Sequence, residues 1–195
     1  MRGESVATEH SMSKILVAVD DSDAARAALR YAAHLASLRS AGAVTATVLT
    51  VWQPIETVGI DGVGLKLDSD FPKSSEALIE QLLRETGSDA FERVVRAGSV
   101  AVEIVSEAEI GHHDLIVVGT RAHGAPHQAT LGRVSQEVSG NGDVPVAVVP
   151  GTWHAAAGPV LVGFDGSSSS RAALRWALRH TPEDVVVLRV IYPGA

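Results

Sequence analysis

The 195-residue sequence contains no cysteine, which excludes disulfide bonds, thiolate catalysis and cysteine-ligated zinc, and fits a reducing compartment. Aromatic residues make up only 4% of the chain although 46% of it is hydrophobic, so the core must consist of valine, leucine, isoleucine and alanine. No apolar run approaches the ~18 residues that a membrane-spanning helix needs. These absences indicate a globular protein with an aliphatic core.

Positive charge is also scarce, with 16 Lys and Arg residues against 23 Asp and Glu residues and a net charge of −7. Because no basic cluster stands out, we expect neither a nucleic acid nor a membrane surface as partner. The first twelve residues contain Glu4 and Glu9 and lack the apolar segment of a secretory signal. We therefore expect a flexible tail over residues 1–12 and a cytoplasmic protein.

Short apolar runs alternate along the chain with stretches of helical periodicity. The runs predict strands at 14–20, 44–52, 91–98, 114–119 and 144–150, and the periodic stretches predict helices at 22–40, 73–86, 99–110 and 129–140. Ser22 or Asp23 can cap the first helix, and the glycine-containing segment 55–72 is expected to be a long connection. This alternation predicts an α/β fold, a parallel sheet with helices on both faces.

In such sheets, ligands bind outside the carboxyl ends of the strands. Asp20, Val51 and Gly119 each lie at the carboxyl end of a predicted strand, which places three separate segments on one edge of the sheet. Gly119 also opens the stretch GTRAHGAPHQATLGRVSQ, which leads from a strand into a helix. Strand-to-helix turns of this kind often hold phosphates, although neither a Walker A pattern nor a dinucleotide fingerprint is present.

The sequence also contains an internal repeat. The segment ILVAVDDSDAARAALRYA at 15–32 matches VLVGFDGSSSSRAALRWA at 160–177 without gaps. Asp20 aligns with Asp165 and Arg26 with Arg171, a constant offset of 145 positions. The following VVVLRVIYP resembles ATVLTVWQP at 46–54. The match indicates a duplication whose second copy contains one strand, one helix and one strand.

The segments KILVAVDDSDAARAALRYAAHLA and DLIVVGTRAHGAPHQATLGRVSQEVSGNGDVPVAVVP resemble the opening and closing parts of the universal stress protein family. The resemblance implies a doubly wound five-stranded sheet of strand order 3-2-1-4-5. It also implies four regions: a tail at 1–12, a complete domain at 13–151, a linker at 152–158 and a partial second β-α-β copy at 159–195.

The ATP-binding branch of that family carries the pattern G-x2-G-x9-G-[S/T], and another branch has lost it. Here the pattern becomes Gly119, Ala122, Gly132 and Arg133, so the spacing is kept and two residue types are not. A side chain at Ala122 would cost ~1–2 kcal/mol if that position needs a positive φ. Arg133 could fill the pocket, or fold outward and grip a phosphate, and Ser135 keeps a hydroxyl nearby.

The resemblance also implies roles for residues at the nucleoside end. Asp20 matches a carboxylate near the ribose or adenine, Val51 matches an adenine-contacting position, and Ala18 and Val118 match positions that line the pocket. Asp21 replaces a frequent glycine and adds negative charge, which disfavours a polyphosphate unless Mg²⁺ bridges the carboxylates.

Simpler interpretations stand beside these. The loop could be an ordinary turn, and Asp20 could serve only to cap its own loop, because the partial copy keeps Asp165 without a phosphate loop. His123 and His127 have helical metal-ligand spacing, but Pro126 between them argues against a helix, and we expect no metal site. No His-x-Gly-His-type signature follows the first strand, which argues against a nucleotidyl-transferring enzyme.

The sequence thus predicts a universal stress protein that binds ATP with Mg²⁺ as a switch or sensor, with at most slow hydrolysis and no nameable catalytic residue. The alternative is an interaction module of the same fold that binds no nucleotide. The resemblance implies a homodimer formed through the strand at 144–150. Two strands and one helix are marginal alone, so residues 159–195 are expected to pack on the first domain or on a partner chain.

Overall fold

A computed structural model describes residues 12–38, 44–53, 58–59, 62–63, 71–120, 131–156, 158–181 and 184–189. It divides into two compact units, one comprising Ser13–His154 and the other including Ala155–Ala195. The expected tail at 1–12 lies outside the described residues except for Met12. Each unit is described separately below.

The first unit contains a five-stranded parallel sheet with the order β5-β2-β1-β6-β7. The strands are β1 (Lys14–Ala18), β2 (Thr45–Trp52), β5 (Glu92–Ala97), β6 (Leu115–Gly119) and β7 (Val146–Val149). Counting only these five strands along the chain, the order is 3-2-1-4-5. The expected fold class and strand order are therefore confirmed.

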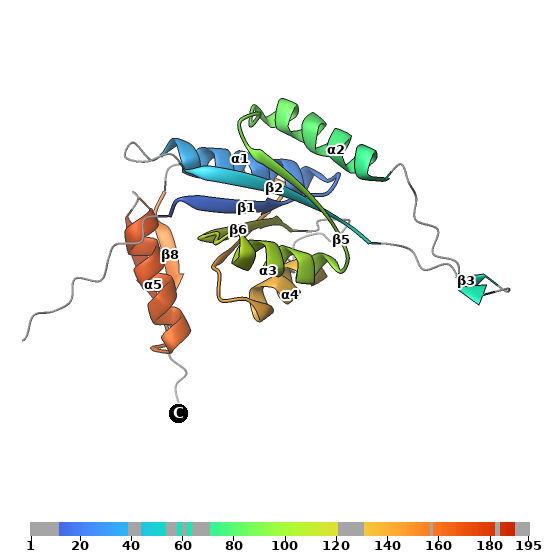
Figure 1. Cartoon of the computed structure of the whole chain (residues 1–195). Coiled ribbons are helices and arrows are strands. Elements are labelled where there is room, and N and C mark those ends of the chain that lie inside the picture. The colour runs from blue at the N-terminus through green and yellow to red at the C-terminus, as the bar shows by residue number, and fades with distance from the viewer. Residues whose placement is uncertain are drawn as a thin grey trace, which may run out of the picture. The chain divides into compact units, whose positions relative to one another are not determined.

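Four helices cover the two faces of this sheet (Figure 1). Helices α1 (Asp23–Ser37) and α2 (Phe71–Thr86) lie on one face, and α3 (Val100–Ile110) and α4 (Arg133–Asn141) lie on the other. Ser22 caps α1, because its hydroxyl oxygen accepts a hydrogen bond from the backbone N–H of Ala25 at 3.1 Å. The cap fixes where the chain turns from β1 into the helix.

The core is aliphatic, as the low aromatic content requires. Leu16 and Leu49 are fully buried and pack beneath Ile104 of α3 and Val138 of α4. On strand β6 every residue from Leu115 to Val118 is at most 3% exposed. Burial on both faces explains why this strand is an unbroken apolar run rather than an alternating one.

Three elements differ from the sequence prediction. Helix α4 begins at Arg133 rather than at 129, because Gly132 has an extended backbone (φ −63°, ψ 158°) and forms its N-cap. Helix α2 begins at Phe71, since Pro72 is tolerated in a first turn that does not use its missing N–H. The connection 55–72 contains an antiparallel pair, β3 (Val58–Gly59) and β4 (Gly62–Val63), which is too short to leave a period-2 pattern.

The second unit contains a parallel pair of strands joined by a helix. They are β8 (Val160–Gly163), α5 (Ser168–His180) and β9 (Val185–Leu188). Ser167 caps α5 by accepting a hydrogen bond from the N–H of Ser170 at 3.1 Å. Asp165 accepts another from the N–H of Ser167 at 2.8 Å, and the Ser167 hydrogen bonds lower the pKa of Asp165 to about 2.

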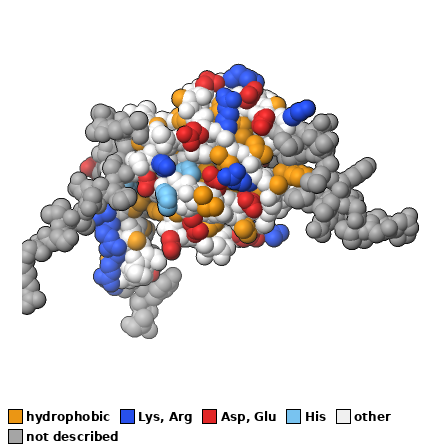
Figure 2. Space-filling model, in the orientation of Figure 1, with side chains coloured by type: hydrophobic (Ala, Val, Ile, Leu, Met, Phe, Trp, Pro, Cys, Tyr) orange, Lys and Arg blue, Asp and Glu red, His pale blue; other side chains and the backbone are white. Residues whose placement is uncertain are grey.

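On the face shown in Figure 2, acidic and basic side chains are interspersed with hydrophobic ones over the first unit. Among the described residues, no helix has both the length and the apolar character needed to cross a membrane.

Candidate functional site

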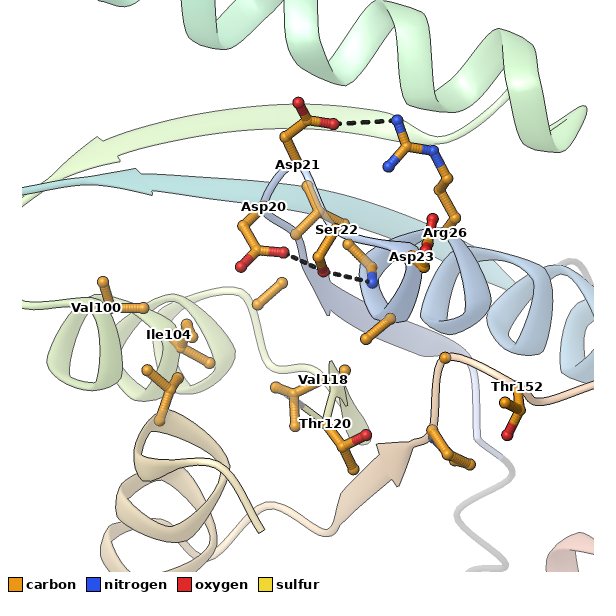
Figure 3. Close-up of a pocket in the computed structure, with 18 residues that line it drawn as sticks. Asp20, Asp21, Ser22, Asp23, Arg26, Val100, Ile104, Val118, Thr120 and Thr152 are labelled. Atoms are coloured by element: carbon orange, nitrogen blue, oxygen red, sulfur yellow. Dashed lines mark hydrogen bonds and ion pairs between the residues drawn. The ribbon is translucent and has the colours of Figure 1, made fainter. Parts of the chain in front are cut away.

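A cavity of about 540 Å³ opens at the carboxyl edge of the sheet in the first unit. Its walls come from the turn between β1 and α1, the end of β6, the first turns of α3 and α4, and the segment that follows β7. Figure 3 shows Asp20 and Ser22 on one side of it, with Val118 and Thr120 across from them. Parallel strands bring these segments together because their carboxyl ends share one edge.

The side formed by the β1–α1 turn is acidic. Asp20, Asp21 and Asp23 all line the cavity. The hydroxyl of Ser22 donates to Oδ1 of Asp20 at 2.5 Å while its oxygen accepts from α1, so the helix cap also orients this carboxylate. One oxygen of Asp20 is thereby fixed on the cavity side of the turn.

Arg26 balances part of this negative charge. Its guanidinium donates to Oε2 of Glu85 on α2 at 2.8 Å and to Oδ1 of Asp21 at 3.0 Å. Hydrogen bonding to Glu85, and then to Asp21, raises the pKa of Arg26 above its ordinary value. Figure 3 shows Asp21 directed toward Arg26 and away from Asp20. The excess charge beside the cavity therefore comes from Asp20 and Asp23.

The opposite side of the cavity is mainly apolar. Ala18, Val100, Ile104, Val118 and Val134 line it, and all of them belong to or pack against the core that α3 and α4 cover. Val51 is half-buried and packs against the same core without lining the cavity. The cavity thus has an apolar wall that suits a flat ring and an acidic wall that suits hydroxyl donors.

Gly119 lies where strand β6 passes close to helix α1. A Cβ atom at this position would lie 2.7 Å from the carbonyl carbon and from Cβ of Ala24. The glycine is therefore required by packing between strand and helix, independently of any ligand.

The predicted phosphate-facing residues occupy different surroundings. Gly132 precedes α4 and supplies no side-chain cap to its first turn. Arg133 is 89% exposed, and its Nε donates to Glu137 at 2.8 Å, so it neither fills the cavity nor points into it. Hydrogen bonding to Glu137 raises the pKa of Arg133. Ser135 is buried, and its hydroxyl donates to the carbonyl oxygen of Gly119 at 3.2 Å.

Ala122, His123, Pro126 and His127 lie outside the described residues. Among the described residues, no group of three or more His, Asp or Glu side chains is placed to hold a metal ion.

Several residues of the cavity wall are not among those expected from the sequence: Val100, Ile104, Thr120, Val134, Pro150, Gly151 and Thr152. The rule that ligands gather at strand ends also applies to the strand that ends at 150, and would have indicated the segment 150–152. Nothing in the sequence alone would have placed the first turn of α3 beside β6.

Comparisons with known proteins support this fold. The model of the universal stress protein family matches residues 12–150. A universal stress protein of Mycolicibacterium smegmatis is 31% identical over 198 residues, covering 94% of this chain and 65% of that relative. The chain thus spans less than two thirds of the length of this relative.

Two solved structures share the fold. Universal stress protein UspA from Lactobacillus plantarum is 25% identical, with a TM-score of 0.53, over 71% of this chain and 97% of that one. A universal stress protein crystallised in complex with cAMP gives a TM-score of 0.51 at 18% identity, over 72% of this chain and 98% of that one. At that identity the second likeness concerns the fold alone.

Proposed function

The chain belongs to the universal stress protein family, and from that premise we propose that its cavity binds an adenine nucleotide, ATP with Mg²⁺, as a switch or sensor. The observation that carries the proposal is the pairing of Asp20 with the apolar wall of Ala18 and Val118, beside Gly119 at the carboxyl edge of the sheet. The cavity volume of about 540 Å³ falls within the range of small-molecule sites. A relative with this fold was crystallised with cAMP, another adenine nucleotide.

The two walls suggest how the nucleoside would lie. The adenine ring would contact Ala18 and Val118, with Val51 supporting the wall behind them. The carboxylate of Asp20 would accept hydrogen bonds from ribose hydroxyls, since one of its oxygens is already oriented by Ser22.

The phosphates would then lie toward Gly119, Ala122, Gly132 and Arg133. The first turn of α4 offers backbone N–H groups and the positive end of a helix dipole. For Arg133 to reach a phosphate it must leave Glu137, and an exposed ion pair between residues four apart on a helix contributes little to stability. The outward position of Arg133 therefore opposes phosphate binding only weakly.

Magnesium fits this arrangement. Nucleotide-bound Mg²⁺ usually takes one or two protein carboxylates together with phosphate oxygens. Asp20 would supply such a carboxylate, and the ion would offset the repulsion between the acidic rim and a polyphosphate. We propose no fast catalysis, and slow hydrolysis at most.

An interaction module without nucleotide is the second candidate, and two observations favour it. Asp20 is hydrogen-bonded to Ser22 in its own loop, as its counterpart Asp165 is to Ser167. The acidic rim also opposes an anionic ligand in the absence of metal. In this case the protein would act in the cytoplasm through dimerisation. Strand β7 lies at the sheet edge, and its half-buried Val146 and Val148 support an interface there.

The test compares Asp20→Ala with Asp165→Ala, which removes the equivalent carboxylate of the second unit. Nucleotide-stripped proteins are titrated with adenosine and with MgATP. Adenosine carries no charge, so its binding reports the ribose contact without phosphate repulsion. We expect Asp20→Ala to weaken adenosine binding by about tenfold or more, since a hydrogen bond to a charged group contributes about 1.5–3 kcal/mol. Asp165→Ala should bind as the wild type does. Equal binding by all three proteins would contradict the assigned site.

A further inference from the structure

Two buried hydroxyl groups hold the strand ends that form the cavity. The first belongs to Thr50 on β2, which is 6% exposed. Its Oγ1 donates to the carbonyl oxygen of Val19 at 2.9 Å. The last ladder bond between these strands is donated by the N–H of Val19 to the carbonyl of Leu49 at 2.9 Å. Beyond this bond β1 and β2 are no longer paired. The Thr50 hydroxyl donates to the carbonyl oxygen of Val19 in place of a backbone N–H.

The second hydroxyl repeats this arrangement on the other side. Ser135 of α4 is 2% exposed, and its Oγ donates to the carbonyl oxygen of Gly119, the last residue of β6. The next N–H, that of Thr120, donates to the carbonyl of Val149 on β7 at 2.8 Å. Val19, Gly119 and Thr120 all line the cavity.

We infer that Thr50 and Ser135 are positioning residues for the ligand site. Each fixes the plane of the peptide unit that leads out of a strand and into the cavity wall. Thr50 orients the peptide that carries Asp20, and Ser135 orients the peptide that carries Thr120. Ser135 therefore acts through the β6 backbone rather than by contacting phosphate, which revises the role suggested by its sequence position.

The geometry explains why a hydroxyl stands at each position. A buried carbonyl that leaves a ladder needs a new donor, and a buried serine or threonine hydroxyl supplies one without adding charge. A ligand that binds through Asp20 requires the carboxylate oxygen of that residue at a fixed position. The consequence for ligand affinity rests on the proposed function, whereas the positioning of the backbone does not.

The test uses Thr50→Val, which keeps the shape of the side chain and removes the donor, and Ser135→Ala. Thr86→Val and Ser37→Ala are matched controls, because these hydroxyls donate to carbonyls within α2 and α1, away from the cavity. Thr50→Ser restores the donor. Backbone hydrogen–deuterium exchange and adenosine affinity are measured for each variant.

We expect Thr50→Val to accelerate amide exchange in the segment 19–23 and to weaken adenosine binding by about tenfold. Ser135→Ala should accelerate exchange at 119–120 and weaken binding similarly, and Thr50→Ser should recover the wild-type behaviour. The controls should leave both segments and the affinity unchanged. Affinity that is unaffected, or exchange that rises uniformly along the chain, would reduce the two hydroxyls to a general stabilising role and overturn the inference. If the wild type binds no adenosine, the proposed function fails, and unchanged local exchange would then overturn the positioning as well.

Discussion

Gly119 combines two requirements at the centre of the site. It ends a strand that lines the cavity, and it lets that strand approach the backbone of Ala24, where a Cβ atom on residue 119 would lie 2.7 Å away. We predict that Gly119→Ala lowers the free energy of unfolding by about 1–3 kcal/mol, because backbone atoms of α1 must move to admit the methyl group.

Gly140→Ala is the matched control, since a Cβ atom there meets nothing within 4 Å and the position is inside helix α4. It should be neutral or stabilise the protein by up to about 1 kcal/mol. Urea unfolding of both variants measures the difference. If Gly119→Ala is as stable as the wild type, the closeness of α1 does not exclude a methyl group at residue 119, and the prediction is wrong.

His113 makes stability depend on pH. Its side chain is buried, and its Nδ1 lies 3.2 Å from the carbonyl oxygen of Glu107. Burial lowers the pKa of His113 below its ordinary 6.5. The unfolded chain therefore takes up this proton at a higher pH than the folded chain, so stability is complete above about pH 6.5 and falls as the pH drops below it.

Urea midpoints at pH 7.5 and 5.5 test this for the wild type and for His113→Gln. The wild type should lose more stability than the variant on acidification. An identical pH dependence in both proteins would mean that His113 is not the responsible group.

At the residue scale, the position of Ala18, Asp20, Val118 and Gly119 at one edge of the sheet could be predicted, because strand ends are readily recognised in a sequence. All four line the cavity, and their contact with a nucleotide stays a prediction. The partners of Arg133 and Ser135 could not be predicted, because they depend on the rotation of α4 about its axis. That rotation is set by where the helix begins, and helix starts are poorly marked when the N-cap is a glycine.

At the scale of elements, the strands and helices of the main sheet could be predicted because their apolar periodicities are strong.

Local sequence patterns do not predict how the chain packs against α1 after β7. Trp153 packs edge-to-face on Tyr31 of α1, with ring centroids 5.2 Å apart, and lies 5.8 Å from the ring of His34. The turn that presents it is closed by a hydrogen bond from its N–H to the carbonyl of Pro150. The cavity segment 150–152 is thereby anchored to α1.

We predict that Trp153→Ala lowers the stability of the first unit by about 1–3 kcal/mol through lost aromatic contact and burial. Trp153→Phe should retain much of that stability, because a smaller ring can still meet Tyr31. Chemical unfolding followed by far-ultraviolet circular dichroism gives both values. Equal unfolding midpoints for the alanine variant and the wild type would exclude this anchoring role.

At the scale of the whole molecule, the second unit has apolar side chains that its own elements do not cover. Leu161 and Leu188 are 62% and 49% exposed, whereas the matching Leu16 and Leu49 of the first unit are fully buried beneath α3 and α4. A two-stranded sheet with one helix has a small core and is marginally stable alone. We therefore expect this face to pack on the first domain or on a partner chain.

Limited proteolysis combined with light scattering tests that expectation. Residues 159–195 should resist cleavage in the native protein, and Leu161→Ser should make them more susceptible. A monomer whose residues 159–195 are cut rapidly under native conditions would contradict it.

We propose that the cavity binds ATP although two residues of the family pattern, at positions 122 and 133, are replaced. Calorimetric titration of MgATP into the nucleotide-stripped full chain tests it most directly. We expect saturable binding in the micromolar range, which would show that Ala122 and Arg133 are tolerated. No heat up to millimolar MgATP, together with an unchanged melting temperature, would contradict it and make the protein an interaction module.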